Sequence, residues 1–207
     1  MKKITLSICL MLSVASVYSQ SKGEDYKNTG DMKGVTEDYK GAIQDYTKAI
    51  AANPNYADAY SSRAFAKFLL TNYSSALKDY DKAIELKIGN PELYNSRGLT
   101  RIHLKNYKEA ILDFNEAIKI KSDYAEAYNN RGYAKYQLKD FSGAIQDYNK
   151  AIQLKSDYAT AYNNRGLAKI GAGDKLGACE DFTKGSKLKD PRAIDNIQEY
   201  CVEEEKK

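Results

Sequence analysis

Apolar, small and polar residues recur along this chain with a period of 34 residues. Shifting the sequence by that interval superimposes one tyrosine and one alanine per unit: Tyr26, Tyr60, Tyr94, Tyr128 and Tyr162, and Ala42, Ala76, Ala110, Ala144 and Ala178. With the tyrosine counted as position 4, the units span residues 23–56, 57–90, 91–124, 125–158 and 159–192, without gaps. A fixed period of this length is typical of a repeat protein whose units stack on their neighbours.

Each unit is predicted to contain two helices, at about positions 2–14 and 18–31, joined by a short polar turn such as Leu138-Lys139-Asp140. Glycine or alanine at position 8 and alanine at position 20 allow the two helices to approach closely. An aromatic residue at position 24 is expected to fill the space between them: Tyr46, Tyr80, Phe114, Tyr148 and Phe182. Because burying such a ring contributes about 1.5–3 kcal/mol, we interpret these rings as core residues.

This pattern resembles the tetratricopeptide repeat (TPR), with tyrosine at the usual tryptophan position 4 and alanine at position 27 of the first four units. The resemblance covers residues 23–192, although Pro54 is the only proline at position 32, where the family carries one. It implies an all-α, right-handed solenoid of five helix-turn-helix repeats. In such a solenoid the first helices line a concave groove and the second helices form the convex back.

Two charged positions repeat together and depart from the family pattern. Position 7 is arginine in four units (Arg63, Arg97, Arg131, Arg165), and position 23 is aspartate in all five (Asp45, Asp79, Asp113, Asp147, Asp181). A partly buried guanidinium is costly unless a carboxylate accepts its hydrogen bonds, and its planar shape suits a bidentate pair. We therefore expect a ladder of ion pairs; the alternative is a basic stripe that binds acidic ligands.

The two ends of the chain differ from the repeats. Residues 1–19 carry Lys2 and Lys3 before an apolar run and are predicted to be a secretory signal peptide, followed by a linker at 20–22. The run of roughly 14 residues is short for a retained membrane anchor, which needs about 20. Glycines at Gly30 and Gly34 lower the helix propensity of the first repeat. Residues 193–207 are expected to form a capping helix and a charged tail.

Two cysteines lie outside the predicted signal peptide, Cys179 in the last repeat and Cys201 in the expected cap. Position 21 is otherwise isoleucine or leucine, so Cys179 is expected to point toward the cap. In an exported protein a disulfide between the two is plausible and would contribute about 3 kcal/mol; the alternative is two buried thiols.

The composition offers little for catalysis or for nucleic-acid binding. His103 is the only histidine, so we expect no metal site, no cofactor and no enzymatic activity. Removing Lys2 and Lys3 with the signal peptide leaves 30 basic residues against 28 acidic ones, a formal charge of +2. Because the two signs are interleaved along the chain, we expect neither nucleic-acid binding nor stable membrane insertion after cleavage.

The resemblance implies that positions 2, 5, 6, 9, 12 and 13 of the first helices face the groove. The residues expected there to bind a partner are Phe65, Phe68, Asn95, Leu99, Asn129, Asn130, Tyr133, Tyr136, Asn163 and Asn164. Aromatic rings would anchor an extended or helical segment, and amide side chains would hold its backbone. The alternative for the aromatic residues is that they only shield contacts between helices.

These observations favour an exported, periplasmic or secreted, non-catalytic scaffold that holds another protein or peptide in the groove. The second interpretation is self-assembly into a homo-oligomer through the groove or the first repeat. A third, an enzyme, would need a reaction that avoids histidine and metal.

Overall fold

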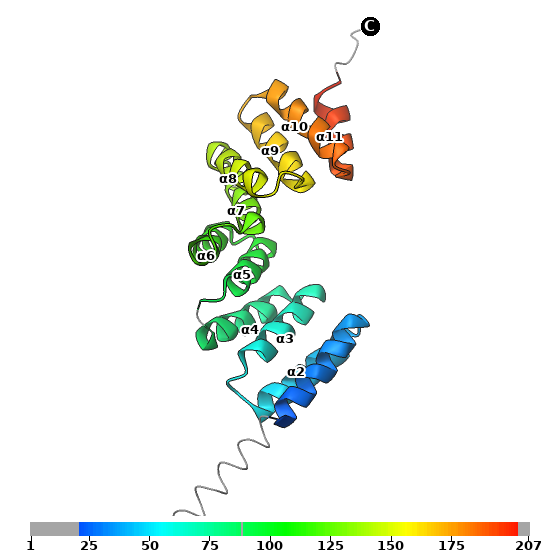
Figure 1. Ribbon diagram of the computed structural model, residues 1–207, viewed down its shortest axis with the longest axis vertical. Coiled ribbons are helices and arrows are strands. Elements are labelled where there is room, and N and C mark those ends of the chain that lie inside the picture. Colours follow the sequence, from blue (N-terminus) through cyan, green and yellow to red (C-terminus); the bar gives the residue numbers. More distant parts are fainter. Residues whose placement is uncertain (1–20, 88, 203–207) are drawn as a thin grey trace, which may run out of the picture. The chain divides into compact units, whose positions relative to one another are not determined.

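The computed structural model describes residues 21–87 and 89–202, and within them the regular structure is entirely helical. The predicted signal peptide, Ile88 and the end of the charged tail lie outside the described residues. After a leading helix at residues 21–35 (the leading helix below), ten further helices follow. They are α2 (Tyr39–Ala52), α3 (Ala57–Leu69), α4 (Tyr73–Leu86), α5 (Pro91–His103), α6 (Tyr107–Ile120), α7 (Ala125–Gln137), α8 (Phe141–Leu154), α9 (Ala159–Gly171), α10 (Lys175–Lys187) and α11 (Pro191–Tyr200), as Figure 1 shows.

The helices occur as pairs at the predicted places. In the fourth repeat, for example, α7 and α8 begin and end about one residue before the positions expected from the pattern. The chain divides into two compact units, one up to Thr100 and the other from Arg101. In the first unit α3 contacts both α2 and α4, and in the second each helix from α6 to α11 contacts the next. In addition α7 contacts α9, so the first helices of repeats four and five lie side by side.

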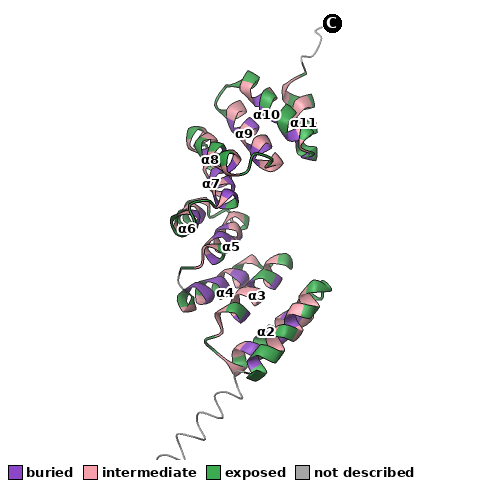
Figure 2. Ribbon diagram, in the orientation of Figure 1, coloured by how far each residue is buried: buried purple, intermediate pink, exposed green. Residues whose placement is uncertain are grey.

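The small residues at position 8 allow an aromatic ring to lie against the first helix. A Cβ atom added to Gly132 would lie 2.8 Å from Cε1 of Tyr148, and one added to Gly30 would lie 2.6 Å from Cε1 of Tyr46. Gly30 therefore has a packing role in the first repeat, beyond its low helix propensity. Figure 2 shows the buried residues on the faces where paired helices meet, with the exposed ones on the outer faces.

The turn inside each repeat uses a residue in the left-handed region. Position 15 has φ of 62° at Glu37, 59° at Thr71, 60° at Lys105 and 63° at Lys139, and 87° at Gly173. This conformation reverses the chain between the two helices of a pair. It is strained for a residue with a Cβ atom, and most strained for a β-branched one.

Aspartate at position 16 caps the second helix in three repeats. The carboxylates of Asp38, Asp140 and Asp174 each accept a hydrogen bond of 2.9 Å from the backbone N–H three residues later, at Gly41, Gly143 and Gly177. Each glycine leaves room for the cap, because a Cβ atom there would collide with the capping carboxylate. The sequence pattern Asp-x-x-Gly thus marks the start of these helices.

The last helix closes the stack as expected. Asp190 accepts a hydrogen bond from the backbone N–H of Arg192 and begins α11, and Ala193 is fully buried. The ring of Tyr200 lies against Phe182 with centroids 6.0 Å apart. Cys179 of α10 and Cys201 are joined by a disulfide with Cα atoms 5.7 Å apart, so α11 is held at both of its ends.

Candidate partner-binding surface

The predicted ion-pair ladder is present in repeats two, four and five. Arg63 donates two hydrogen bonds of 2.8 Å, from Nε and Nη2, to the two carboxylate oxygens of Asp79. Arg131 makes the same bidentate pair with Asp147, and Arg165 makes it with Asp181. These pairs join the first helix of a repeat to its second helix, and the aspartates are buried.

Each of these aspartates also has a second cation, from position 11. Lys67 lies 2.8 Å from Asp79, Lys135 lies 2.7 Å from Asp147, and Lys169 lies 2.8 Å from Asp181. In the third repeat Arg101, also at position 11, lies 2.8 Å from Asp113. In the first repeat, hydrogen bonds from Lys33 and then from Lys48 lower the pKa of Asp45. Lysine or arginine stands at position 11 in all five repeats, a recurrence that was not among the charged positions predicted from the sequence.

The arginines also connect each repeat to the one before it. Nη1 of Arg63 donates to Thr47 at 3.0 Å, Nη1 of Arg131 to Asn115 at 2.7 Å, and Nη1 of Arg165 to Asn149 at 2.6 Å. Each guanidinium further lies over the ring of the tyrosine at position 4, with distances of 5.3–5.6 Å to the ring centroid. Because their donors are used inside the stack, these arginines support the ladder interpretation over a stripe for acidic ligands.

The expected amide row lies mostly between repeats. Asn95, Asn129 and Asn163 are 8%, 5% and 1% exposed. Nδ2 of Asn164 donates to Oδ1 of Asn129 at 3.1 Å, and Nδ2 of Asn196 donates to Oδ1 of Asn163 at 2.7 Å. Asn129 and Asn163 therefore bond neighbouring helices to one another. The half-buried Asn130 accepts a hydrogen bond from Nδ2 of Asn129 at 3.4 Å.

In the second unit the predicted apolar residues form a half-buried strip on α7 and α9. Tyr133 and Tyr136 of α7 and Leu167 and Ile170 of α9 are all half-buried. The Tyr136 ring lies 5.7 Å from that of Phe141, between centroids. Burial raises the pKa of the Tyr133 phenol.

In the first unit one of the expected aromatic residues, Phe65, borders a hollow of about 360 Å³, called the N-terminal hollow below. Phe65 is 55% exposed and lines it, while Phe68 is half-buried beside Tyr73, with ring centroids 5.3 Å apart. Leu99, also in this unit, is half-buried. The lining comes from three helices: Asp31, Gly34 and Val35 of the leading helix, Tyr39 and Tyr46 of α2, and Ser62, Phe65 and Ala66 of α3.

The sequence analysis had not included the residues of the leading helix in the site. Asp31, Gly34 and Val35 occupy positions 9, 12 and 13, the same face as Phe65 and Phe68 in the second repeat. The 34-residue period assigns these residues to that face, but they were not predicted to bind a partner because glycines lower the helix propensity of the first repeat. The Tyr46 hydroxyl donates to Oδ1 of Asp31 at 3.0 Å, and burial together with that carboxylate raises the pKa of Tyr46.

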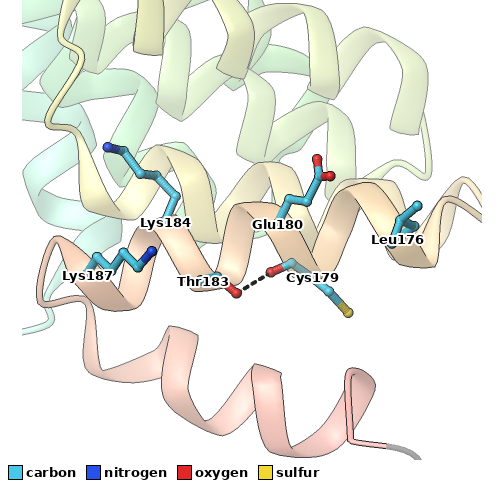
Figure 3. A pocket seen from close by; sticks show the side chains of 6 residues that line it. All are labelled: Leu176, Cys179, Glu180, Thr183, Lys184 and Lys187. Carbon is cyan, nitrogen blue, oxygen red and sulfur yellow. Dashed lines mark hydrogen bonds between the residues drawn. The ribbon is translucent and has the colours of Figure 1, made fainter.

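A second hollow, of about 470 Å³, lies along α10. Figure 3 shows its lining, which includes the exposed Leu176, Cys179 pointing toward α11, and Lys184 and Lys187. The hydroxyl of Thr183 donates to the carbonyl of Cys179 at 2.8 Å. This surface belongs to a second helix and lies apart from the first-helix face.

The described residues offer little for metal or membrane binding. Across residues 21–87 and 89–202, no three histidine, cysteine, aspartate or glutamate side chains gather as metal ligands. His103 is exposed at the end of α5. Within the same ranges no helix combines the length and the apolar character required to cross a bilayer.

The arrangement of helices and the repeating contacts agree with a comparison against known protein families. The model of the TPR repeat matches residues 36–70, 100–139 and 132–171, which together make up slightly more than half of the chain. This chain belongs to the TPR repeat family. The matched segments include both charged positions of the ladder and the tyrosines of α7.

Solved TPR structures share the fold across most of their length. A crystal structure of MamA is 27% identical, covering 80% of this chain and 96% of the other, with a TM-score of 0.73. YrrB, described as a TPR protein with an unusual peptide-binding site, is 18% identical over 84% and 90% of the two chains, with a TM-score of 0.72. PilF of Pseudomonas aeruginosa is 18% identical over 85% and 81%, with a TM-score of 0.74. No curated protein sequence matches this chain.

Proposed function

We propose that this TPR protein is a non-catalytic scaffold that holds a segment of another protein on the face formed by its first helices. The observation that supports it is the distribution of apolar side chains. The rings at position 24 are buried, whereas Phe65 is more than half exposed and Tyr133 and Tyr136 are half-buried on the first-helix face. Partly exposed aromatic residues of this kind are typical anchors for a partner.

The fold itself favours this function. A peptide-binding site is part of the description of YrrB, a protein with the same fold, although its low identity supports the fold alone. The ladder arginines and the buried asparagines hold the helices of each repeat in place. A partner would therefore meet a preformed surface, which lowers the entropic cost of binding.

Photocrosslinking in cells tests the proposal. A photoreactive amino acid replaces Tyr136, and crosslinked species are identified by mass spectrometry. A matched control carries the same group at Leu112 of α6, which is 63% exposed on a second helix in the same unit. We expect a specific partner from position 136 and not from position 112.

Two results would contradict the proposal. Crosslinks only to other copies of this chain, with a mass in light scattering that grows with concentration, would favour self-assembly. Equal capture from positions 112 and 136 would remove the first-helix face as the site.

We also propose that the protein is exported, because residues 1–19 read as a signal peptide. Sequencing the N-terminus of protein isolated from its native compartment tests this. A mature chain that begins at Gln20 is expected, and an intact N-terminus in the cytoplasm would exclude export.

A further inference from the structure

The N-terminal hollow has the lining of a site for one apolar side chain. Val35 is 85% exposed and Phe65 is 55% exposed, and both lie at the hollow. Gly34 has no side chain to fill the hollow. The space beside it is open, because a Cβ atom added there would meet only the Tyr46 hydroxyl, at 3.6 Å. The lining therefore combines a position without a side chain on the leading helix with an exposed ring on α3.

Three acids, called the acidic rim below, lie on the two helices that flank this hollow: Asp31 lines it, and Glu24 and Asp58 lie two helical turns from lining residues. Asp31 lines the hollow, and its side chain is 40% exposed although it pairs with Lys27 at 2.6 Å. Glu24 lies two helical turns before Asp31 and is exposed. On α3, Asp58 lies two turns before Phe65 and pairs with Lys87 at 3.0 Å, with about half of each side chain exposed.

The carboxylates gather around one phenol. Burial raises the pKa of Tyr56; Lys27 opposes the shift, while the negative charges of Glu24, Asp58 and Asp31 add to it. The three acids thus act on the same small region between the leading helix and α3. Glu24, Asp31 and Asp58 (−3) against their neighbours Lys27 and Lys87 (+2) leave a formal charge of −1 there, although the whole chain has a formal charge of +4.

Apolar lining and acidic rim together define the partner. We propose that the N-terminal hollow receives one apolar side chain of a basic partner segment, whose lysine or arginine residues lie beside Glu24, Asp31 and Asp58. The inference rests on the proposed function and names the chemistry of the segment that the scaffold holds. A cationic segment gains from the negative rim, mainly in association rate and in choice of partner, while the anchor supplies most of the affinity.

Peptide titration measures this directly. The probe is a fluorescein-labelled heptapeptide with a central leucine, two lysines on each side of it and a glycine at each end, added to protein purified from cells that express the full chain. Replacing the leucine with serine is expected to raise Kd at least about tenfold, because burial of a leucine side chain is worth more than that factor. Replacing the lysines with glutamates is expected to abolish binding at low salt.

A variant of the protein separates the hollow from other surfaces. Gly34→Leu places an apolar side chain in the hollow without changing charge, and leucine is a better helix former than glycine, so the fold is retained. Binding of the leucine heptapeptide is expected to fall at least about tenfold. Asp31→Asn is expected to weaken it about threefold or more at low salt, whereas Asp157→Asn, in an exposed turn of the second unit, leaves it unchanged.

Each other outcome overturns the inference. Binding that Gly34→Leu does not alter would place the peptide elsewhere, and equal binding of the glutamate peptide would remove the charge preference. A dimer that disappears in Gly34→Leu would assign the hollow to a second copy of this chain. If Tyr136 still captures a partner while the heptapeptide fails to bind, the inference fails and the scaffold function stands.

Discussion

Arg131 and Asp147 face each other across the fourth repeat in a planar, bidentate pair, with Nε donating to Oδ2 at 2.9 Å and Nη2 donating to Oδ1 at 2.6 Å. The carboxylate is buried, and Lys135 lies 2.7 Å away on the same oxygen as Nε. The single negative charge of Asp147 therefore pairs with two cations, Arg131 and Lys135. The aspartate at position 23 is the residue on which the charge balance between the two helices of a repeat depends.

Asp147→Ala is expected to lower the free energy of unfolding by about 2–4 kcal/mol, because Arg131 and Lys135 lose their partner inside the stack. Urea denaturation followed by circular dichroism measures the change. Asp157→Ala, at an exposed turn in the same unit, is the matched control and should change stability by less than about 0.5 kcal/mol. Unchanged stability of Asp147→Ala would instead favour the alternative that the arginines bind acidic ligands.

Gly132→Ala is expected to destabilise the fold by about 1–3 kcal/mol, although alanine is the better helix former. Its Cβ atom would lie 2.8 Å from the ring of Tyr148, which is 1% exposed and has no space in which to move. Gly34→Ala is the control, since its Cβ atom has only an ordinary contact. That variant should be more stable than the natural protein by about 0.5–1 kcal/mol. Equal effects of the two substitutions would contradict the packing argument.

Thr71→Gly is expected to stabilise the protein by about 0.5–1 kcal/mol. Thr71 has φ of 59°, which a β-branched residue adopts only with strain, and the gain exceeds the added chain entropy of glycine. The reciprocal substitution, Gly173→Ala at φ of 87°, should cost about 1 kcal/mol. Thermal unfolding of both variants beside the natural protein gives the comparison. A lower melting temperature for Thr71→Gly would show that the threonine side chain supplies contacts that outweigh the strain.

The disulfide between Cys179 and Cys201 closes a separation of 22 residues and should contribute about 3 kcal/mol in the chain-entropy model. Intact mass after alkylation without reductant should show no modified thiol in the mature protein. Cys201→Ser or added reductant should lower the melting temperature. Two alkylated thiols in unreduced protein would instead support the free-thiol alternative.

Stability should fall at high pH because of the buried tyrosines. Burial raises the pKa of Tyr80 from 10.0 to about 12. Between these values the unfolded chain loses the proton that the folded protein keeps, so folding stability decreases by up to about 1.4 kcal/mol per pH unit. The contribution is fully present below pH 10. Unfolding at a series of pH values, with Tyr80→Phe as the comparison, should show a smaller decrease in the variant; an identical slope would exclude Tyr80 as a source.

Much of the fold follows from the 34-residue period, because each repeat buries the same residues and so repeats the same pattern. Arg165 and Asp181 were predicted as partners for the same reason: their charges recur at fixed positions. The second cation, Lys169, was missed because a lysine on a helix is most often a solvated surface residue. Its long carbon chain allows the amine to reach a buried acid, and the sequence does not show in which direction the chain extends.

The candidate site was less accessible to prediction. Asn129 and Asn163 were expected to bind a partner, but their side chains accept hydrogen bonds from Asn164 of α9 and Asn196 of α11. A repeat period shows which positions are equivalent, and not which side chains of neighbouring helices bond to one another. The N-terminal hollow depends on a side chain that is absent at Gly34 and on the meeting of three helices. Neither property can be recognised from one segment of the sequence.

The hydrogen bonds between consecutive repeats, called joints here, would allow the protein to be lengthened by whole repeats. Arg165 reaches back to Asn149, and Arg131 reaches back to Asn115, so consecutive joints use the same donor and the same acceptor. A duplicate of residues 125–158 placed after residue 158 would therefore find matching partners on both sides. Gene duplication in units of 34 codons can lengthen the stack of helices without redesigning these contacts, while the terminal helix α11 continues to close the last repeat.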